Sequence, residues 1–213
     1  MIENNQEYWN EGYWKRVINN QKNSFKNRNW IDKYKEIINK VEGNNAVDLG
    51  CGIGQDTKWL IDNGFDVISC DISNIALEKL KELIQNSKTL QIDMRETLPF
   101  KENSINLVNA DLSIHYFCMK DTIRIFNEIN RILTPNGILI GRVNSDKNER
   151  YIREETKVIE DNYYYDFEKY FRLFNKEQFD ILSKNWKIIV LNEDIITRVN
   201  KKKVLWEFIF QKI

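Results

Sequence analysis

A glycine-rich turn flanked by two acidic residues is the strongest chemical signal in this sequence. The turn occupies residues 50–54 (GCGIG) and directly follows the short run 46–49, which contains Asp48. Because glycine has no Cβ, the backbone of such a turn can approach a ligand closely. Asp71 ends the next apolar run, at a position where a carboxylate can accept hydrogen bonds from both hydroxyls of a ribose. The alternative interpretation is a tight turn beside a solvated carboxylate.

The spacing of the glycines argues against a dinucleotide as the ligand. Dinucleotide-binding proteins normally carry GxGxxG, and the helix that follows receives a pyrophosphate at its N-terminus. Here the third glycine, Gly54, comes one residue early, and Asp48 lies two residues before the first glycine. A carboxylate at Asp48 would repel a pyrophosphate, whereas it would suit an ammonium group. The ligand implied has a ribose, no phosphate and a cationic end.

Alternating apolar segments indicate the sheet that must position these residues. Strands that alternate with helices at this spacing form right-handed βαβ units and a parallel sheet. Two later runs, 186–191 and 204–210, are expected to pair antiparallel at the sheet edge, joined by residues 192–203. We therefore predict an α/β fold with a doubly wound, mostly parallel, seven-stranded Rossmann-like sheet whose last strand is antiparallel. The central strands are predicted at 46–49, 66–70, 89–92, 104–110 and 138–143, and the helices at 55–63, 73–86 and 121–133.

The two ends of the chain differ from this alternating middle. Residues 6–40 are predicted to form two aromatic-rich helices, and residues 144–172 are charged and tyrosine-rich with no predicted strand. The stretch 146–160 is a candidate solvated helix, and the lysines at 201–203 are expected in an exposed hairpin turn. We expect a single domain over 1–213. Its expected parts are an N-terminal helical cap (1–40), a ligand-binding core (41–145) and a closing segment with the antiparallel strands (146–213).

Composition excludes several classes of protein. Of the 213 residues, 42% are hydrophobic, which is enough for one packed core. Lys and Arg together number 32, as do Asp and Glu, and a chain with no basic excess is a poor candidate for binding nucleic acid. No run approaches the roughly 20 apolar residues of a membrane span, and the polar N-terminus is not a secretory signal. Cys51, Cys70 and Cys118 form no CxxC pair, so we expect no metal site and a cytoplasmic location.

Several motifs in register resemble those of the class I S-adenosylmethionine-dependent methyltransferases. VDLGCGIG at 47–54 and DVISCDIS at 66–73 resemble the first two motifs of that family, and QIDM at 91–94 resembles its third-strand motif. Residues 104–117 resemble the fourth-strand motif, although Asn106 stands where the family usually has an acid. Residues 128–137 (EINRILTPNG) resemble the helix and turn before the fifth strand. More weakly, YWN at 8–10 resembles the opening of small-molecule members, and the tail from 172 resembles the tellurite-resistance and thiopurine-type branch.

The resemblance implies a set of cofactor contacts. The glycine turn would face the methionine part of S-adenosylmethionine, Asp48 its amino group and Asp71 its ribose. Asp93 and Met94 would meet the adenine; Ile72 would pack on it, or is an ordinary core isoleucine. Fourth-strand residues would open toward the sulfonium, and N-terminal aromatics would fold over the pocket or form a plain docking helix. The implied cofactor-binding residues are Tyr8, Trp14, Asp48, Gly50, Cys51, Gly52, Gly54, Asp71, Ile72, Asp93, Met94, Asn109 and Ala110.

His115, the single histidine of the chain, is the candidate catalytic residue. As a neutral imidazole it would act as a general base toward a protonated acceptor. The alternative is a structural histidine, because transfer to sulfur or to an ionised oxygen needs positioning and exclusion of water but no base.

We therefore expect methyl transfer from S-adenosylmethionine to a small-molecule acceptor by in-line displacement, with S-adenosylhomocysteine as product. The partners expected are this acceptor and neither nucleic acid nor membrane. A macromolecule methyltransferase is the alternative among enzymes, and the missing basic excess argues against it. A cofactor-binding or regulatory protein without turnover is the alternative from another class, and intact cofactor motifs do not exclude it.

Overall fold

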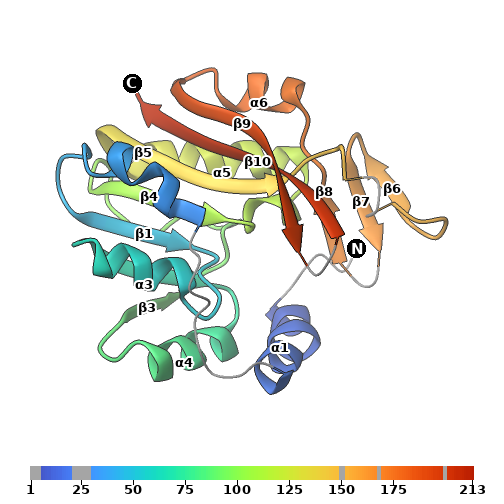
Figure 1. Ribbon diagram of the computed structural model, residues 1–213, viewed down its shortest axis with the longest axis horizontal. Helices are drawn as coiled ribbons and strands as arrows, with labels where there is room; N and C mark the ends of the chain where they lie inside the picture. Colours follow the sequence, from blue (N-terminus) through green and yellow to red (C-terminus); the bar gives the residue numbers. More distant parts are fainter. Residues whose placement is uncertain (1–5, 21–29, 149–151, 167–168, 199–200) are drawn as a thin grey trace.

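The central sheet is mixed, with parallel strands in its middle and an antiparallel pair at one edge (Figure 1). The computed structural model describes residues 6–20, 30–148, 152–166, 169–198 and 201–213. Within these ranges the sheet has seven strands in the order β3-β2-β1-β4-β5-β10-β9. The strands are β1 (Asn45–Leu49), β2 (Asp66–Asp71), β3 (Lys88–Gln91), β4 (Ile105–Asp111), β5 (Leu133–Asn144), β9 (Trp186–Arg198) and β10 (Lys201–Lys212).

The chain reverses its direction of winding between β1 and β4. β1 is parallel to β2 on one side and to β4 on the other, while β10 runs antiparallel to both β5 and β9. This arrangement confirms the predicted fold, including the antiparallel last strand. In open sheets of this kind ligands bind outside the carboxyl ends of the strands at the reversal point. The end of the sheet beyond Leu49 and Asp111 is therefore where the site is expected.

Side-chain alternation along the strands gives the sheet two apolar faces. On β10, Phe208 and Phe210 belong to one buried cluster, and Ile209 between them belongs to the other. Because successive strand residues point to opposite faces, this pattern requires cover on both sides. The first face packs against α5 (Met119–Ile132) and α6 (Lys176–Leu182), and the second against η2 (Trp30–Tyr34), α2 (Lys35–Ile38) and α3 (Gln55–Asp62).

The aromatic N-terminal segment is helical, as predicted, but irregular. It begins as a π-helix, η1 (Tyr8–Trp14), and continues as α1 (Lys15–Asn20). η1 contacts α4 (Asn74–Leu83), where the Ser73 hydroxyl donates to Asn10 Oδ1 at 2.7 Å. Ser73 also accepts from the Ala76 N–H as the N-cap of α4, which confirms the predicted helix start. This contact fastens the N-terminal segment next to the end of β2.

The prediction that residues 144–172 contain no strand is wrong. β6 (Lys157–Glu160), β7 (Tyr163–Asp166) and β8 (Lys169–Arg172) form an antiparallel three-stranded sheet. Figure 1 shows this small sheet beyond the ends toward which β4 and β5 point. The aromatic pairs Tyr163–Tyr170 and Tyr164–Phe171 stack across β7 and β8 at 5.7 and 5.6 Å between centroids, contacts that stabilise such strands. Four-residue strands show too little alternation for the sequence to reveal them. The candidate helix at 146–160 is not found at 146–148 or 152–156, and 157–160 form β6; residues 149–151 lie outside the described residues.

The hairpin that joins the last two strands is also tighter than predicted. β9 and β10 pair from Trp186–Lys212 to Arg198–Lys201, so residues 192–198 and 201–203 are strand and not linker. Lys203, expected in an exposed turn, is only 6% exposed. Lys201–Lys203 pair with Arg198–Ile196 of β9, whereas the ladder with β5 begins only at Leu205. Residues 199–200 lie outside the described residues.

Candidate cofactor and acceptor site

A cavity of about 370 Å³ lies at the carboxyl ends of β1, β2 and β4. Its volume is within the range typical of small-molecule sites. Most of the residues proposed from sequence meet there. Those that line the cavity are Trp14, Gly50, Cys51, Gly52, Asp71, Ile72, Asp93, Met94 and His115. Those that lie outside its lining are Tyr8, Asp48, Gly54, Asn109 and Ala110.

The glycines of the turn serve different contacts. Gly52 has a φ of 54°, and a Cβ added to it would lie 2.6 Å from the Trp14 ring, so the ring packs directly on its backbone. Gly54 has a φ of 90°, and a Cβ there would lie 2.7 Å from the side chain of Leu80 on α4. Gly52 therefore permits the close approach of the Trp14 ring, whereas Gly54 permits close packing of α3 against α4.

Asp71 joins the end of β2 to the glycine turn. Its Oδ2 accepts from the Gly52 N–H and its Oδ1 from the Ser73 N–H, both at 2.9 Å. Burial raises the pKa of Asp71 above its usual value, and these backbone donors act in the opposite direction. Each carboxylate oxygen keeps a second acceptor site. The side chain is thus fixed in orientation and can still accept from ribose hydroxyls.

Asp48 lies beneath the turn and not in the cavity wall. It is 2% exposed, and its two oxygens accept from the Thr57 hydroxyl at 2.7 Å and the Asn109 amide at 2.8 Å. Burial raises its pKa to about 6, although both donors oppose the shift. Its contact with the cofactor's amino group stays a prediction.

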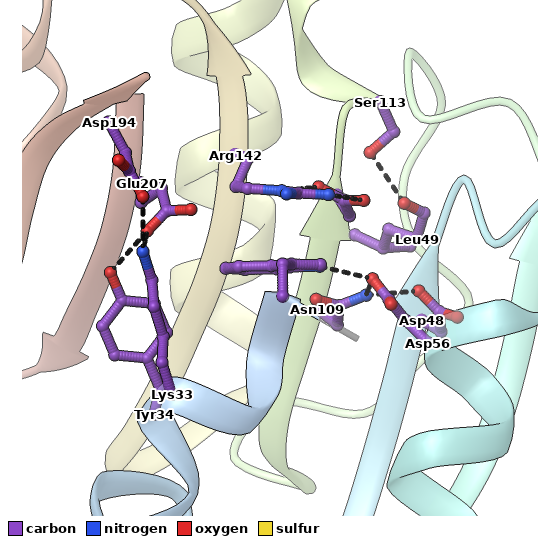
Figure 2. Close-up of polar contacts among 12 residues, drawn as sticks. Lys33, Tyr34, Asp48, Leu49, Asp56, Asn109, Ser113, Arg142, Asp194 and Glu207 are labelled. Atoms are coloured by element: carbon purple, nitrogen blue, oxygen red, sulfur yellow. Dashed lines mark hydrogen bonds and ion pairs between the residues drawn. The ribbon is translucent and has the colours of Figure 1, made fainter. Parts of the chain in front are cut away.

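A network that the sequence did not indicate continues from Asp48 behind the site (Figure 2). Asp56 Oδ2 accepts from the Asn109 amide at 3.2 Å and from the Trp30 indole N–H at 2.9 Å. Burial, followed by the charges of Asp111 and Asp48, raises the pKa of Asp56 to about 7. The Arg142 guanidinium lies 4.4 Å from the centre of the Trp30 ring.

This network ends at the cavity wall. Arg142 on β5 pairs in register with Asp111 on β4, and its guanidinium donates to both carboxylate oxygens at 2.7 and 2.8 Å. Asp111 lines the cavity. The ion pair therefore holds the ends of β4 and β5 together and neutralises an acid in the wall. No local pattern links Trp30, Asp56 and Arg142, because they come from three separate elements.

Asp93 lines the cavity with most of its acceptor capacity already used. The Arg95 side chain donates to both of its oxygens at 2.6 to 3.0 Å. Burial alone would raise the pKa of Asp93, but the hydrogen bonds from Arg95 outweigh burial and the pKa is lowered. Met94 and Ile92 beside it supply apolar surface. The predicted contact of Asp93 with an adenine amino group must share this carboxylate with Arg95.

Aromatic rings from the N-terminal segment cover the cavity. Trp9, Tyr13 and Trp14, here called the roof residues, all line it. The Trp9 ring meets Tyr116 edge-on at 4.6 Å between centroids, and Tyr13 meets Trp14 in the same way at 5.0 Å. Tyr8 contacts Trp9 at 5.0 Å but is not part of the lining. The segment therefore contributes three rings to the cavity lining, and the predicted contact with the cofactor stays a prediction.

A second group of lining residues, here called the acceptor end, comes from elements outside the glycine turn. His115 lies in η3 (Ile114–Tyr116), Asn144 ends β5, and Lys169 and Phe171 come from β8. Burial holds the pKa of His115 well below its usual range, and the charges of Lys203 and Lys169 lower it further. The imidazole is therefore neutral at pH 7.

Residues 47–141 match the family model described as a methyltransferase domain. This match and the geometry of the turn decide the family. The chain contains a class I S-adenosylmethionine-dependent methyltransferase domain over these residues. Its cofactor is S-adenosylmethionine.

Curated relatives of this methyltransferase match its cofactor-binding half. An uncharacterized methyltransferase of Synechocystis sp. is 32% identical over 96 residues, which cover 45% of each chain. The human mitochondrial arginine-hydroxylase NDUFAF5 is 36% identical over 97 residues, 45% of this chain and 27% of the relative. The matched part thus spans less than half of the length of these relatives.

Solved structures match this methyltransferase over a larger share of its chain than the curated relatives do. A methyltransferase from Methanosarcina mazei superposes with a TM-score of 0.71 at 20% identity, covering 83% of this chain and 97% of that one. The PH0226 protein from Pyrococcus horikoshii has a TM-score of 0.69 at 21% identity, covering 86% and 89%. At these identities the likeness concerns the fold alone.

The residues that line the cavity of this methyltransferase are chemically suited to its cofactor. Asp71 has acceptor capacity left for a ribose beside its two backbone donors, and Ile72 and Met94 give apolar surface for a base. Among the described residues, no group of His, Cys, Asp and Glu is arranged to hold a metal ion. No described helix is both long and apolar enough to cross a membrane.

Proposed function

We propose that this protein transfers the methyl group of S-adenosylmethionine to a small-molecule acceptor. One observation supports this most: a single cavity joins the glycine turn to the acceptor end beneath the roof residues. When bound, the cofactor supplies a methyl group on a positively charged sulfur, which an acceptor attacks in line. The chain's own contribution is to orient the two molecules and to exclude water.

His115 is the residue that can handle a proton in this proposal. It is neutral, buried and part of the cavity wall. A neutral imidazole can take a proton from an acceptor hydroxyl or amine as that group becomes methylated. An acceptor that is already ionised needs no such step, and His115 would then only position it.

A macromolecular acceptor is the alternative that the relatives raise. The name of the human relative refers to arginine hydroxylation, and that name describes the relative only. The roof residues favour a small molecule here, because three aromatic rings lie over the cavity that a polymer side chain would have to enter. Membership of the tellurite-resistance and thiopurine-type branch, and a cytoplasmic location, stay predictions.

Two measurements test the proposal. Calorimetry should show binding of S-adenosylmethionine and S-adenosylhomocysteine and none of NAD. Release of S-adenosylhomocysteine should then be followed with thiols, amines, carboxylates and metalloid oxyanions. Turnover with a small acceptor supports the proposal. Cofactor binding with no turnover on any small acceptor, together with methylation of protein or RNA substrates, would contradict it, and tight NAD binding would contradict the cofactor site.

A further inference from the structure

The small sheet of β6 to β8 holds the backbone of a segment that lines the cavity. His115, Tyr116 and Phe117 are consecutive lining residues between β4 and α5. The Tyr116 carbonyl accepts from the Tyr163 hydroxyl on β7 at 3.2 Å. The Phe117 carbonyl accepts from Arg172 Nε on β8 at 3.3 Å. Two neighbouring carbonyls of the cavity wall are therefore fixed by side chains of the small sheet.

Arg172 makes several directed contacts from a buried position. It is 1% exposed, and its guanidinium also donates to the Asp161 carbonyl at 3.0 Å and to the Glu160 carboxylate. A buried cation is costly, and replacing a buried ion pair by apolar side chains is often neutral for stability. Packing alone does not explain a guanidinium at this position, whereas the fixing of backbone carbonyls does.

Glu160 connects the same arginine to the start of α5. Its Oε1 accepts from the Met119 N–H at 2.6 Å, and Met119 is the first residue of the helix. The N–H groups of a first helical turn have no partner within the helix, so a carboxylate there fixes where the helix begins. Arg172 and Glu160 thus hold the far end of the segment that carries His115.

The position of this segment determines two ring contacts inside the cavity. The His115 ring lies 4.2 Å from the Tyr116 ring between centroids, and Tyr116 meets Trp9 of the roof at 4.6 Å. A shift of the Tyr116 backbone would change both contacts. Misplacement of reacting groups by about 1 Å can slow an enzyme roughly a hundredfold.

We propose that Arg172 is a positioning residue for methyl transfer. It holds the backbone of Tyr116 and Phe117 and thereby sets where His115 lies in the cavity wall. Arg172 is not among the described residues that line the cavity, so it acts through this segment and not on a ligand. The consequence for turnover rests on the proposed function, whereas the placement of His115 does not.

The single histidine of the chain gives a readout that needs neither cofactor nor acceptor. Proton NMR of its Cε1–H follows the ionisation of His115. Burial holds the pKa of His115 well below its usual range, so the wild-type resonance should not titrate between about pH 5 and pH 8. In Arg172→Met the loosened segment admits water to the imidazole. The resonance should then titrate with a midpoint nearer the ordinary value of about 6.5.

Arg131→Met is the matched control. Arg131 lies in the last turn of α5, donates to the carbonyls of Leu98 and Phe100, and pairs with Glu128. The substitution removes the same charge and contacts of the same kind, and Arg131 is not among the described lining residues. This variant should lower the melting temperature and leave the His115 resonance without a titration.

Two further variants keep the test decisive. Arg172→Lys keeps the charge and a donor, so it should change the His115 titration less than Arg172→Met does. Tyr163→Phe removes the hydroxyl that donates to Tyr116 and should change the titration in the same direction. If Arg172→Met does not fold, an unchanged His115 resonance in Tyr163→Phe overturns the inference.

Turnover completes the test. With a small acceptor that the wild type methylates, Arg172→Met should lower kcat/KM for the acceptor at least about tenfold and keep its affinity for S-adenosylhomocysteine within about twofold. A His115 resonance like that of the wild type, an equal change in Arg131→Met, or unchanged turnover would each overturn the inference. If no small acceptor is methylated, the proposed function fails, and the NMR comparison still decides whether Arg172 places His115.

Discussion

Replacing Asp56 with asparagine should stabilise the protein at alkaline pH but much less at acidic pH. Asp56 lies in the first turn of α3, is 8% exposed, and accepts from both Trp30 and Asn109 on the same oxygen. The oxygen of an asparagine can keep both of these hydrogen bonds. The substitution therefore removes a buried charge without removing its partners.

The magnitude follows from the pKa of Asp56. Burial and the neighbouring acids Asp111 and Asp48 raise it from 3.8 to about 7. Between these values the folded state holds a proton that the unfolded state has lost, so the stability of the wild type falls as pH rises, and the full loss is present above pH 7. Each pKa unit corresponds to about 1.4 kcal/mol, so the roughly two units between pH 5 and pH 7 amount to about 2–3 kcal/mol. The asparagine side chain does not titrate, so the advantage of the Asp56→Asn variant over the wild type should be larger at pH 8 than at pH 5 by that amount.

Urea unfolding followed by circular dichroism at pH 5 and pH 8 measures this difference. Effects of the substitution that do not depend on pH cancel between the two conditions. Asp62→Asn is the matched control: it lies on the same helix, is exposed and pairs with Lys58, so its pH dependence should stay within about 0.5 kcal/mol. An equal effect of Asp56→Asn at both pH values would refute the reasoning. It would mean that Trp30 and Arg142 keep Asp56 charged in spite of its burial.

Three further predictions concern Asp71, the N-terminal segment that carries the roof residues, and the buried hydrogen bond of Tyr34. Asp71→Asn should weaken S-adenosylhomocysteine binding at least about tenfold in calorimetry, since it weakens charge-assisted hydrogen bonds to the ribose; unchanged affinity in folded protein would place the ribose contact elsewhere. Deleting residues 1–20 should weaken cofactor binding and change the melting temperature of the cofactor-free protein little, because Trp14 lies on Gly52 and not in the core; a clearly lower melting temperature with unchanged affinity would contradict this. Tyr34→Phe should lower the free energy of unfolding by about 1–2 kcal/mol, because its hydroxyl donates to the buried Glu207 at 2.7 Å. Tyr164→Phe, whose hydroxyl lies 3.4 Å from its partner, is the control for that experiment and should change stability by less.

Local sequence patterns were sufficient to predict the parts of the site that lie within one βαβ unit. The turn at 50–54 and Asp71 are joined by short-range connections, so their types and spacing already bring them together at the end of β1 and β2. The alternating strands also predicted a doubly wound, mostly parallel sheet, because connections of this kind are short and right-handed. For Asp48, the motif gives only a position in the sequence. The packing shows that Thr57 and Asn109 hold its side chain beneath the turn.

Other features depended on contacts between distant segments, which no local pattern records. The strands β6 to β8 were missed because four-residue strands owe their stability to cross-strand rings, as between Tyr164 and Phe171. Lys203 was expected in solvent because its neighbours in sequence are lysines, yet β10 carries it into the cavity lining. The sequence by itself determined the sheet, the family and the glycine turn, since these follow from periodicity and short motifs. Only the tertiary structure decided the rest of the cavity lining, because His115, Lys169 and Lys203 come from three elements that meet only when the chain is folded.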